Sequence, residues 1–181
     1  LFLSGCGTGT WVAEIGGNDL AVNGLSSAVF SDGCSLTIDA MPWVVHEVSV
    51  RNASGYIYGL STISNTVFDA SNPNSSTIWT TDLAALLYTQ QDIKVAPGIA
   101  TVLDDGMETT LGKEFDSNNG SLGLYGTLSC GDDSVGLRWV FSNSITFYCG
   151  TKLKLAADTE NVTRFEVDPS QWFRPSALGA E

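Results

Sequence analysis

His46 is the only histidine of the 181-residue chain, so any acid–base or nucleophilic device that needs an imidazole must use it. Within the run Trp43 to Val50, alternation places His46 on a face with valines. This setting fits a hydrogen-bonded core histidine, and it also fits a general acid–base group inside an apolar cavity. Arg138 is the charged exception in the apolar run Val135 to Phe141. We take His46 and Arg138 as the candidate catalytic residues.

Four aromatic residues are candidates for binding a ligand. Tyr56 and Tyr58 share one face of a predicted strand and suit a cavity mouth. Trp43 and Trp139 lie in apolar strands and suit a cavity wall. One histidine together with acids is a poor ligand set for a catalytic metal, and no nucleotide-binding glycine motif is present. We therefore expect no metal and no cofactor.

Short β-like runs separated by turn residues recur along the chain and must position these residues. This spacing is typical of an antiparallel barrel or a sandwich. The predicted strands are Thr10–Glu14, Ala28–Ser31, Ser35–Ala40, Trp43–Val50, Tyr56–Ile63, Ser121–Cys130, Val135–Phe141, Ile145–Cys149, Lys152–Ala156 and Arg164–Val167. The predicted class is all-β, as an antiparallel β-barrel or as a β-sandwich or jelly roll.

One stretch breaks the strand pattern. Thr80 to Tyr88 has a potential N-cap, an acidic first turn and three leucines at helical spacing, which predicts one short helix near residues 81–90. Residues 168–181 contain two prolines and are predicted to form an extended tail that packs through its aromatic residues. The predicted organisation is therefore one β-rich domain, 1–167, and a C-terminal tail, 168–181.

Composition excludes several partners. Eight Lys and Arg against 20 Asp and Glu give a formal charge of −12, so nothing would neutralise a run of phosphates, and we expect no nucleic-acid partner. The same balance disfavours docking by charge on an anionic membrane. No apolar run approaches the roughly 20 residues of a membrane span.

Cysteines and sequons indicate an oxidising compartment. The four cysteines make an even count without a C-x-x-C pair, and four N-x-S/T sequons begin at Asn52, Asn74, Asn119 and Asn161. Together with the scarcity of lysine, they predict a secreted, disulfide-bonded glycoprotein that has lost a signal peptide.

The disulfide pairing stays open. Cys6 with Cys34 and Cys130 with Cys149 close the shortest loops and are the first choice. In a flat meander, however, Cys130 and Cys149 would lie two strands apart, about 9–10 Å, which exceeds the disulfide optimum of about 5.5–6 Å. Cys6 with Cys130, or another long-range pairing, would remove this conflict.

Cys6 has a second interpretation. Leu3-Ser4-Gly5-Cys6 matches the end of a bacterial lipoprotein signal, in which the cysteine is acylated. Such a signal needs a charged region and an apolar region before the cysteine, and a processed lipoprotein would begin at Cys6. The sequence instead starts at Leu1. We therefore expect a disulfide at this position.

Gly9-Thr10-Trp11, near the start of a β-rich chain of this size, resembles the G-x-W signature of lipocalins. The resemblance implies an eight-stranded barrel with a cavity for a small apolar molecule. It also implies a late arginine packed across the tryptophan, a part that Arg164 would take. Some lipocalin-like proteins are enzymes that fold and cyclise such molecules.

The sequence thus favours a secreted protein that binds a small hydrophobic molecule in a cavity, with a cofactor-free cyclase or isomerase as its enzymatic variant. The alternatives are a carbohydrate-binding or cell-surface module with a filled core, and a structural subunit of a secreted assembly. An aromatic-lined void above roughly 300 Å³ with His46 or Arg138 at its wall separates the first hypothesis from the others.

Overall fold

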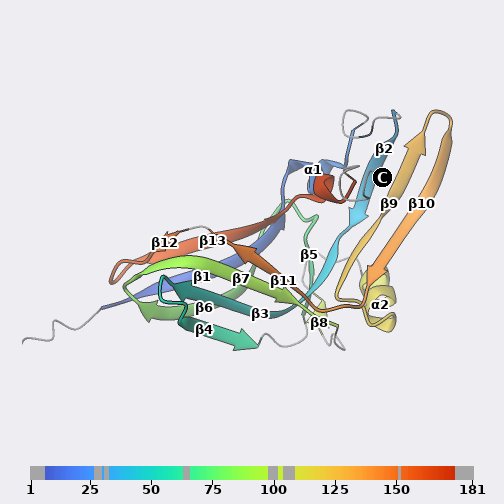
Figure 1. Ribbon diagram of the computed structural model, residues 1–181. Coiled ribbons are helices and arrows are strands. Elements are labelled where there is room, and N and C mark those ends of the chain that lie inside the picture. Colours follow the sequence, from blue (N-terminus) through green and yellow to red (C-terminus); the bar gives the residue numbers. More distant parts are fainter. Residues whose placement is uncertain are drawn as a thin grey trace, which may run out of the picture.

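The computed structural model describes residues 7–26, 30, 33–62, 66–97, 102–103, 109–150 and 152–173. It is mostly β structure in two sheets, accompanied by two α-helices (Figure 1). The all-β class is therefore confirmed, and among the described residues no closed barrel is found.

The smaller sheet has three strands in the order β13-β1-β6. The central strand β1 (Thr8–Gly17) is parallel to β13 (Glu160–Val167) and antiparallel to β6 (Ser76–Ala84). Gly7, just before β1, lies beside the loop after β6, where its carbonyl accepts from Ala85 N–H at 2.9 Å.

The larger sheet is organised by one long strand, β3 (Pro42–Asn52). Its first residues pair with β5 (Thr66–Asp69) and β9 (Leu122–Cys130), and its later residues pair with β4 (Ile57–Thr62) and β7 (Leu87–Val95). The remaining strands attach to these neighbours: β2 (Ser35–Ala40) and β10 (Asp133–Phe141) to β9, β11 (Ile145–Cys149) and β12 (Leu153–Lys154) to β7, and β8 (Val102–Leu103) to β5.

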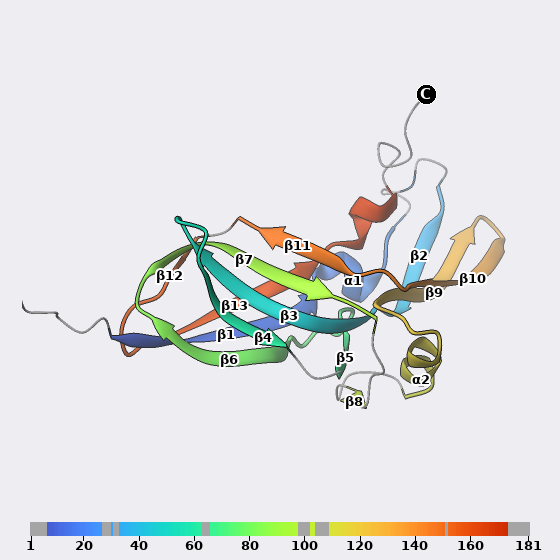
Figure 2. The ribbon, with the colours of Figure 1, turned by 60° about the horizontal axis from the view of Figure 1, so that its bottom comes forward.

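This sharing divides the larger sheet into two parts. Strands β2, β9 and β10 form an arm, while β3, β4, β7, β11 and β12 face the smaller sheet in the body (Figures 1 and 2). The main core lies between the two sheets and includes Trp11, Ile15, Val48, Ile93 and Phe165.

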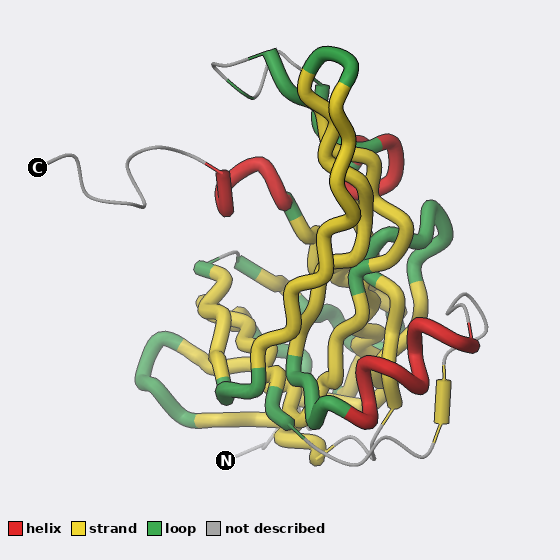
Figure 3. Tube along the Cα trace, turned by 90° about the vertical axis from the view of Figure 1, so that its right-hand side faces the viewer, coloured by secondary structure: helices red, strands yellow, loops and turns green. Residues whose placement is uncertain are grey.

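Both α-helices lie where no helix was predicted. Helix α1 (Asp19–Asn23) begins after Asn18, whose side chain accepts from Leu20 and Ala21 N–H and so caps the first turn. Helix α2 (Thr109–Ser117) packs Phe115 against the arm, next to Tyr125. Figure 3 shows α2 and the C-terminal 3₁₀ helix η1 (Pro169–Phe173) on opposite sides of the long strands.

The helix predicted near residues 81–90 is wrong, because this stretch forms the end of β6, a turn and the start of β7. Three leucines were too short a pattern to distinguish a helix from a hairpin. The threonines of β6 favour extended backbone, and pairing with β1 buries Ile78 and Leu83. Leu86 and Leu87, two of the three leucines expected on one helix face, are exposed at the turn.

The first-choice disulfide pairing is also wrong. Cys34 is bonded to Cys130 with a Cα–Cα distance of 4.3 Å, and Cys149 is a free thiol. Extending the β2–β9 register by one residue places Cys34 opposite Cys130, and the distance matches a non-hydrogen-bonded antiparallel pair. A long-range pairing therefore prevails. Cys6 lies outside the described residues.

The predicted extended tail needs correction at its beginning. Residues 169–173 form η1, in which Asp168 accepts from both the N–H and the hydroxyl of Ser170. The aromatic packing expected of this segment is present, because the Phe173 ring contacts the rings of Phe30 and Trp139. Residues 174–181 lie outside the described part of the chain.

Candidate functional site

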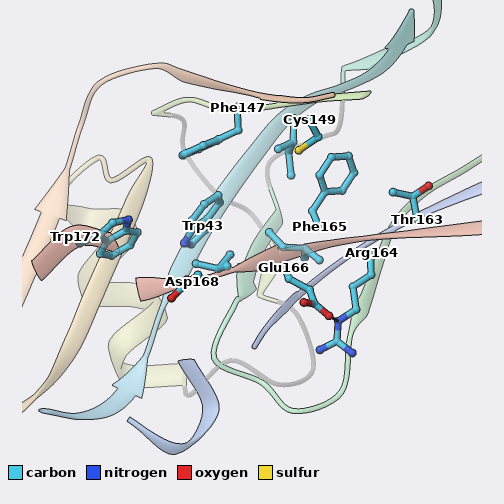
Figure 4. Close-up of a pocket in the computed structure, with 12 residues that line it drawn as sticks. Trp43, Phe147, Cys149, Thr163, Arg164, Phe165, Glu166, Asp168 and Trp172 are labelled. Carbon is cyan, nitrogen blue, oxygen red and sulfur yellow. Dashed lines mark ion pairs between the residues drawn. The ribbon is translucent and has the colours of Figure 1, made fainter. Parts of the chain in front are cut away.

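An apolar cavity of about 370 Å³ lies between the two sheets (Figure 4). It is located where β11 and β13, each an outer strand of its sheet in the described part of the chain, leave the sheets unjoined. The cavity is lined by Ile15, Trp43, Ile93, Phe147, Cys149, Thr163, Arg164, Phe165, Glu166, Val167, Asp168 and Trp172. Its volume exceeds the roughly 300 Å³ expected of a ligand site.

Strand alternation on β13 separates the apolar from the charged part of this wall. Phe165 and Val167 are buried, and the Phe165 ring points toward Cys149 in Figure 4. Arg164 and Glu166 point to the other side of the strand, with their charged groups 3.9 Å apart. The interior surface is therefore aromatic and aliphatic, and the charges lie at its margin.

Trp43 supplies the most informative polar group of the cavity. Its ring stacks on Phe147 with 5.1 Å between the ring centres, and the residue is 4% exposed. The indole Nε1 is buried and has no hydrogen-bond partner among the described residues. A buried donor without an acceptor is costly. Since Nε1 itself is covered by protein atoms, a ligand oxygen can reach it only when neighbouring side chains move aside.

The thiol of Cys149 lies in the same wall. Burial, and secondarily the charge of Asp92, raises the pKa of this thiol above its ordinary value. Cys149 is therefore neutral at physiological pH and is a weak nucleophile. A neutral thiol is compatible with contact to an apolar ligand.

The predicted catalytic residues lie elsewhere. His46 is the extra residue of a β-bulge between Val45 and Glu47. Its side chain is 38% exposed and lies 3.8 Å from the Glu47 carboxylate. The bulge shifts the alternation, so that Val48 rather than Glu47 joins Val45 on the core face. The prediction that His46 faces inward with valines is thus wrong.

Arg138 is exposed on β10, where it forms an ion pair with Glu114 of α2 at 2.8 Å. The strand therefore presents Arg138 to α2 and solvent, and Arg138 does not line the cavity. The neighbouring side chain of Trp139 points to the opposite face and stacks on Phe173 at 5.3 Å. Neither residue contributes to the space between the sheets.

The two predicted tyrosines lie near the β3–β4 turn. Tyr56 is exposed, whereas Tyr58 packs its ring edge against Tyr88, and its hydroxyl accepts from the Asn52 amide at 3.4 Å. Of the four aromatic candidates, only Trp43 lines the cavity.

The sequon asparagines differ in accessibility. Asn74 and Asn119 are exposed, while the Asn52 and Asn161 side chains are half-buried and hydrogen-bonded to neighbours. Glycosylation of these residues stays a prediction.

Sequence reasoning did not identify the other aromatic walls of the cavity. Alternation already placed Phe147 and Cys149 on one face of a predicted strand, and it placed Phe165 and Val167 on one face of another. That signal does not reveal that β11 and β13 face each other, because this juxtaposition depends on how the sheets pack.

The chain matches no protein-family model, no curated protein and no solved structure. The lipocalin resemblance therefore rests on three residues. The detail that it implied for Arg164 is not found: Arg164 donates to the Gly17 carbonyl, whereas the Trp11 indole donates to Thr163 and packs against Trp79. Among the described residues, no group of three or more His, Cys, Asp and Glu side chains is placed to hold a metal ion.

Proposed function

We propose that this protein binds a small, mostly apolar molecule in the cavity between its two sheets. The observation that supports this most directly is the apolar cavity itself, whose wall includes Trp43, a residue with a buried Nε1–H that has no acceptor among the described residues. An aromatic wall supplies contact area, and one oriented donor selects a ligand with an oxygen at a fixed position.

The volume and lining define the class of ligand. A cavity of about 370 Å³ is near the lower end of ligand sites, roughly 300–1,000 Å³. Stacked Trp43 and Phe147 favour a flat or cyclic molecule. We therefore propose a compact aromatic or alicyclic ligand that has one carbonyl or hydroxyl oxygen.

The residues that were expected to catalyse a reaction do not support turnover in this cavity. The groups that were expected to move protons, His46 and Arg138, do not line the cavity. The titratable thiol that does line it, Cys149, is kept neutral by burial. A cyclase or isomerase reaction in this cavity therefore could not use His46 or Arg138; the charged residues that line the cavity are Arg164, Glu166 and Asp168.

A matched pair of ligands tests this proposal. 2-Acetonaphthone and 2-ethylnaphthalene have similar shapes, but only the ketone accepts a hydrogen bond. We expect the ketone to bind more tightly by about 2- to 12-fold, which corresponds to a net hydrogen bond of about 0.5–1.5 kcal/mol. Trp43→Phe should remove this preference while leaving a hydrophobic wall.

Trp79→Phe is the control, because Trp79 packs on Trp11 and does not line the cavity. Titrations followed by calorimetry measure both affinities in each variant, and circular dichroism checks the fold. Failure of both naphthalenes to bind at their solubility limit would refute the proposal. Binding with an equal ketone preference in Trp43→Phe would refute the assigned role of Trp43.

Cys149 gives an independent measurement. A molecule in the cavity should slow alkylation of this thiol, since Cys149 is part of the wall. In Trp43→Phe the ketone should slow alkylation only at a higher concentration, in proportion to its weaker affinity. Unchanged alkylation at saturating ligand would place the binding site elsewhere.

A further inference from the structure

A second cavity, of about 230 Å³, lies on the face of the larger sheet that points away from the core. Its wall comes from β4, β3, β7 and β11, which lie side by side (Figure 2). The core side of these strands carries Val48, Val50 and Ile93, and the side chains of the second cavity belong to the opposite face. The two cavities share no lining residue, so the second cavity is a separate site.

Strand pairing arranges most of this cavity in two adjacent rows that cross three strands. From β3 through β7 to β11, the first row is Glu47, Lys94 and Thr146, and the second row is Ser49, Asp92 and Tyr148. Strands lie about 4.8 Å apart and the rows about 6.8 Å apart, so the frame measures about 10 by 7 Å. A frame of this size suits one six-membered ring with its hydroxyl groups rather than an extended chain.

The β-bulge at His46 brings the β3 residues to this face. Strict alternation from Trp43 and Val45 would turn Glu47 and Ser49 toward the core. The inserted residue reverses the alternation, so that these two side chains point outward together with Arg51. The local feature that completes the core therefore also builds the second cavity.

The floor of the second cavity is polar and buried. Ser49 is 5% exposed and Asp92 is 4% exposed. The Asp92 carboxylate accepts from Arg51 Nε at 2.7 Å through Oδ2 and from the Gln90 amide at 2.6 Å through Oδ1. The buried charge is thus compensated, and its partners are held in fixed positions.

The side chains around this floor keep hydrogen-bonding groups that the internal pairs do not use. Among the described residues, the Arg51 guanidinium donates through Nε alone, which leaves both terminal nitrogens. Lys94 Nζ donates to Glu47 Oε1 at 3.1 Å, which leaves Glu47 Oε2 and further N–H groups of Lys94. Together with the hydroxyls of Ser49 and Thr146, the cavity therefore offers donors and acceptors at close quarters.

Charge and shape narrow the class of ligand. Arg51 and Lys94 cancel Glu47 and Asp92, and the chain as a whole carries −12, so the field gives an anionic ligand no advantage. Tyr148 is 68% exposed at the rim and supplies an aromatic face. A neutral ring with several hydroxyl groups and one C–H face matches both the polar floor and the tyrosine.

We propose that the second cavity binds the terminal neutral pyranose residue of a glycan. The Tyr148 ring lies against one face of the sugar, and Arg51, Lys94 and Glu47 bond to its hydroxyl groups. The residue is terminal because the frame holds a single ring, while the exposed rim at Tyr148 lets the rest of the glycan continue into solvent.

Three methyl glycosides are the probes, namely methyl α-D-glucopyranoside, methyl α-D-mannopyranoside and methyl β-D-galactopyranoside. Each is one neutral pyranose that is blocked where a glycan would continue. We expect at least one of them to bind with a dissociation constant on the order of 1 mM, which is typical of so small a ligand. In NMR titrations the amides of Ser49, Asp92 and Tyr148 should shift, and those of the β9–β10 turn should not. Failure of all three to bind at about 50 mM, well above that constant, or shifts that spare these amides, would overturn the proposal.

Tyr148→Ala should weaken binding of the glycoside about 2- to 12-fold, because it removes the aromatic face. Tyr148→Phe keeps the ring and should keep the affinity. Tyr56→Ala is the matched control, since Tyr56 is 69% exposed but does not line the cavity. Circular dichroism checks the fold of each variant. Unchanged affinity in Tyr148→Ala, or equal weakening in Tyr56→Ala, would overturn the proposal.

Glu47→Gln tests the preference for a neutral sugar. The uronide of the bound glycoside, with a carboxylate at C6, should bind the unmutated protein more weakly than the glycoside itself. Glu47→Gln removes one negative charge from the rim and should reduce this difference about 2- to 5-fold. Tighter binding of the uronide to the unmutated protein would overturn the proposal. So would displacement of the glycoside by 2-acetonaphthone, because the two cavities are separate.

Discussion

The Cys34–Cys130 disulfide allows a quantitative prediction. It joins residues 96 apart in the chain, and the chain-entropy relation gives about 4.7 kcal/mol for a loop of that size. The pairing of nearest cysteines, Cys130 with Cys149, would have given about 3.3 kcal/mol. We therefore expect the double variant Cys34→Ser, Cys130→Ser to lose about 4–5 kcal/mol of unfolding free energy.

Urea denaturation measures this loss through the transition midpoint, with m-values from both proteins. Reduction of the unmutated protein should reproduce the loss, because it opens the same loop. Cys149→Ser is the matched control and should change the midpoint little. A loss below about 2 kcal/mol in the double variant, with an unchanged m-value, would refute this reasoning. It would show that the Cys34–Cys130 disulfide reduces the entropy of the unfolded chain by less than a loop of this length predicts.

Three further predictions concern single residues. Gly120→Ala should cost about 1–3 kcal/mol in urea unfolding, because the new methyl group would overlap the Phe115 ring beneath α2. Arg138→Ala should cost at most about 1 kcal/mol and leave ligand binding unchanged, since its ion pair with Glu114 is exposed. Alkylation of Cys149 should be slower than that of an unfolded control near neutral pH and should rise with pH over a higher range, because burial raises the pKa of the thiol.

The strands were largely predictable wherever the side-chain pattern is local. Residues 35–40 and 145–149 form the predicted strands β2 and β11, and alternation on Val135–Phe141 correctly separates Arg138 from Trp139. These features depend only on which face of a strand each side chain takes. Which strands pair with one another was not predictable in this way, because pairing depends on contacts between segments that are distant in the sequence.

The disulfide illustrates this limit. Cys34 and Cys130 meet because β2 pairs with β9, a contact between segments nearly a hundred residues apart that no local pattern encodes. The shortest-loop rule therefore selected the wrong partners. The helix predicted near residues 81–90 was wrong for a related reason. In this segment only the pairing of β6 with β1 distinguishes a hairpin, with its turn at Leu86 and Leu87, from a short helix.

A single inserted residue explains why the candidate site was predicted only in part. Up to Val45, alternation on β3 places Trp43 inward, and Trp43 lines the cavity. At His46 the bulge adds one residue against β7, so every later side chain changes face relative to strict alternation. His46 therefore points outward toward Glu47, while Val48 and Val50 complete the core. The inward-facing polar group of this strand is consequently the indole of Trp43 rather than the imidazole, so the single histidine of the chain lies outside the cavity wall.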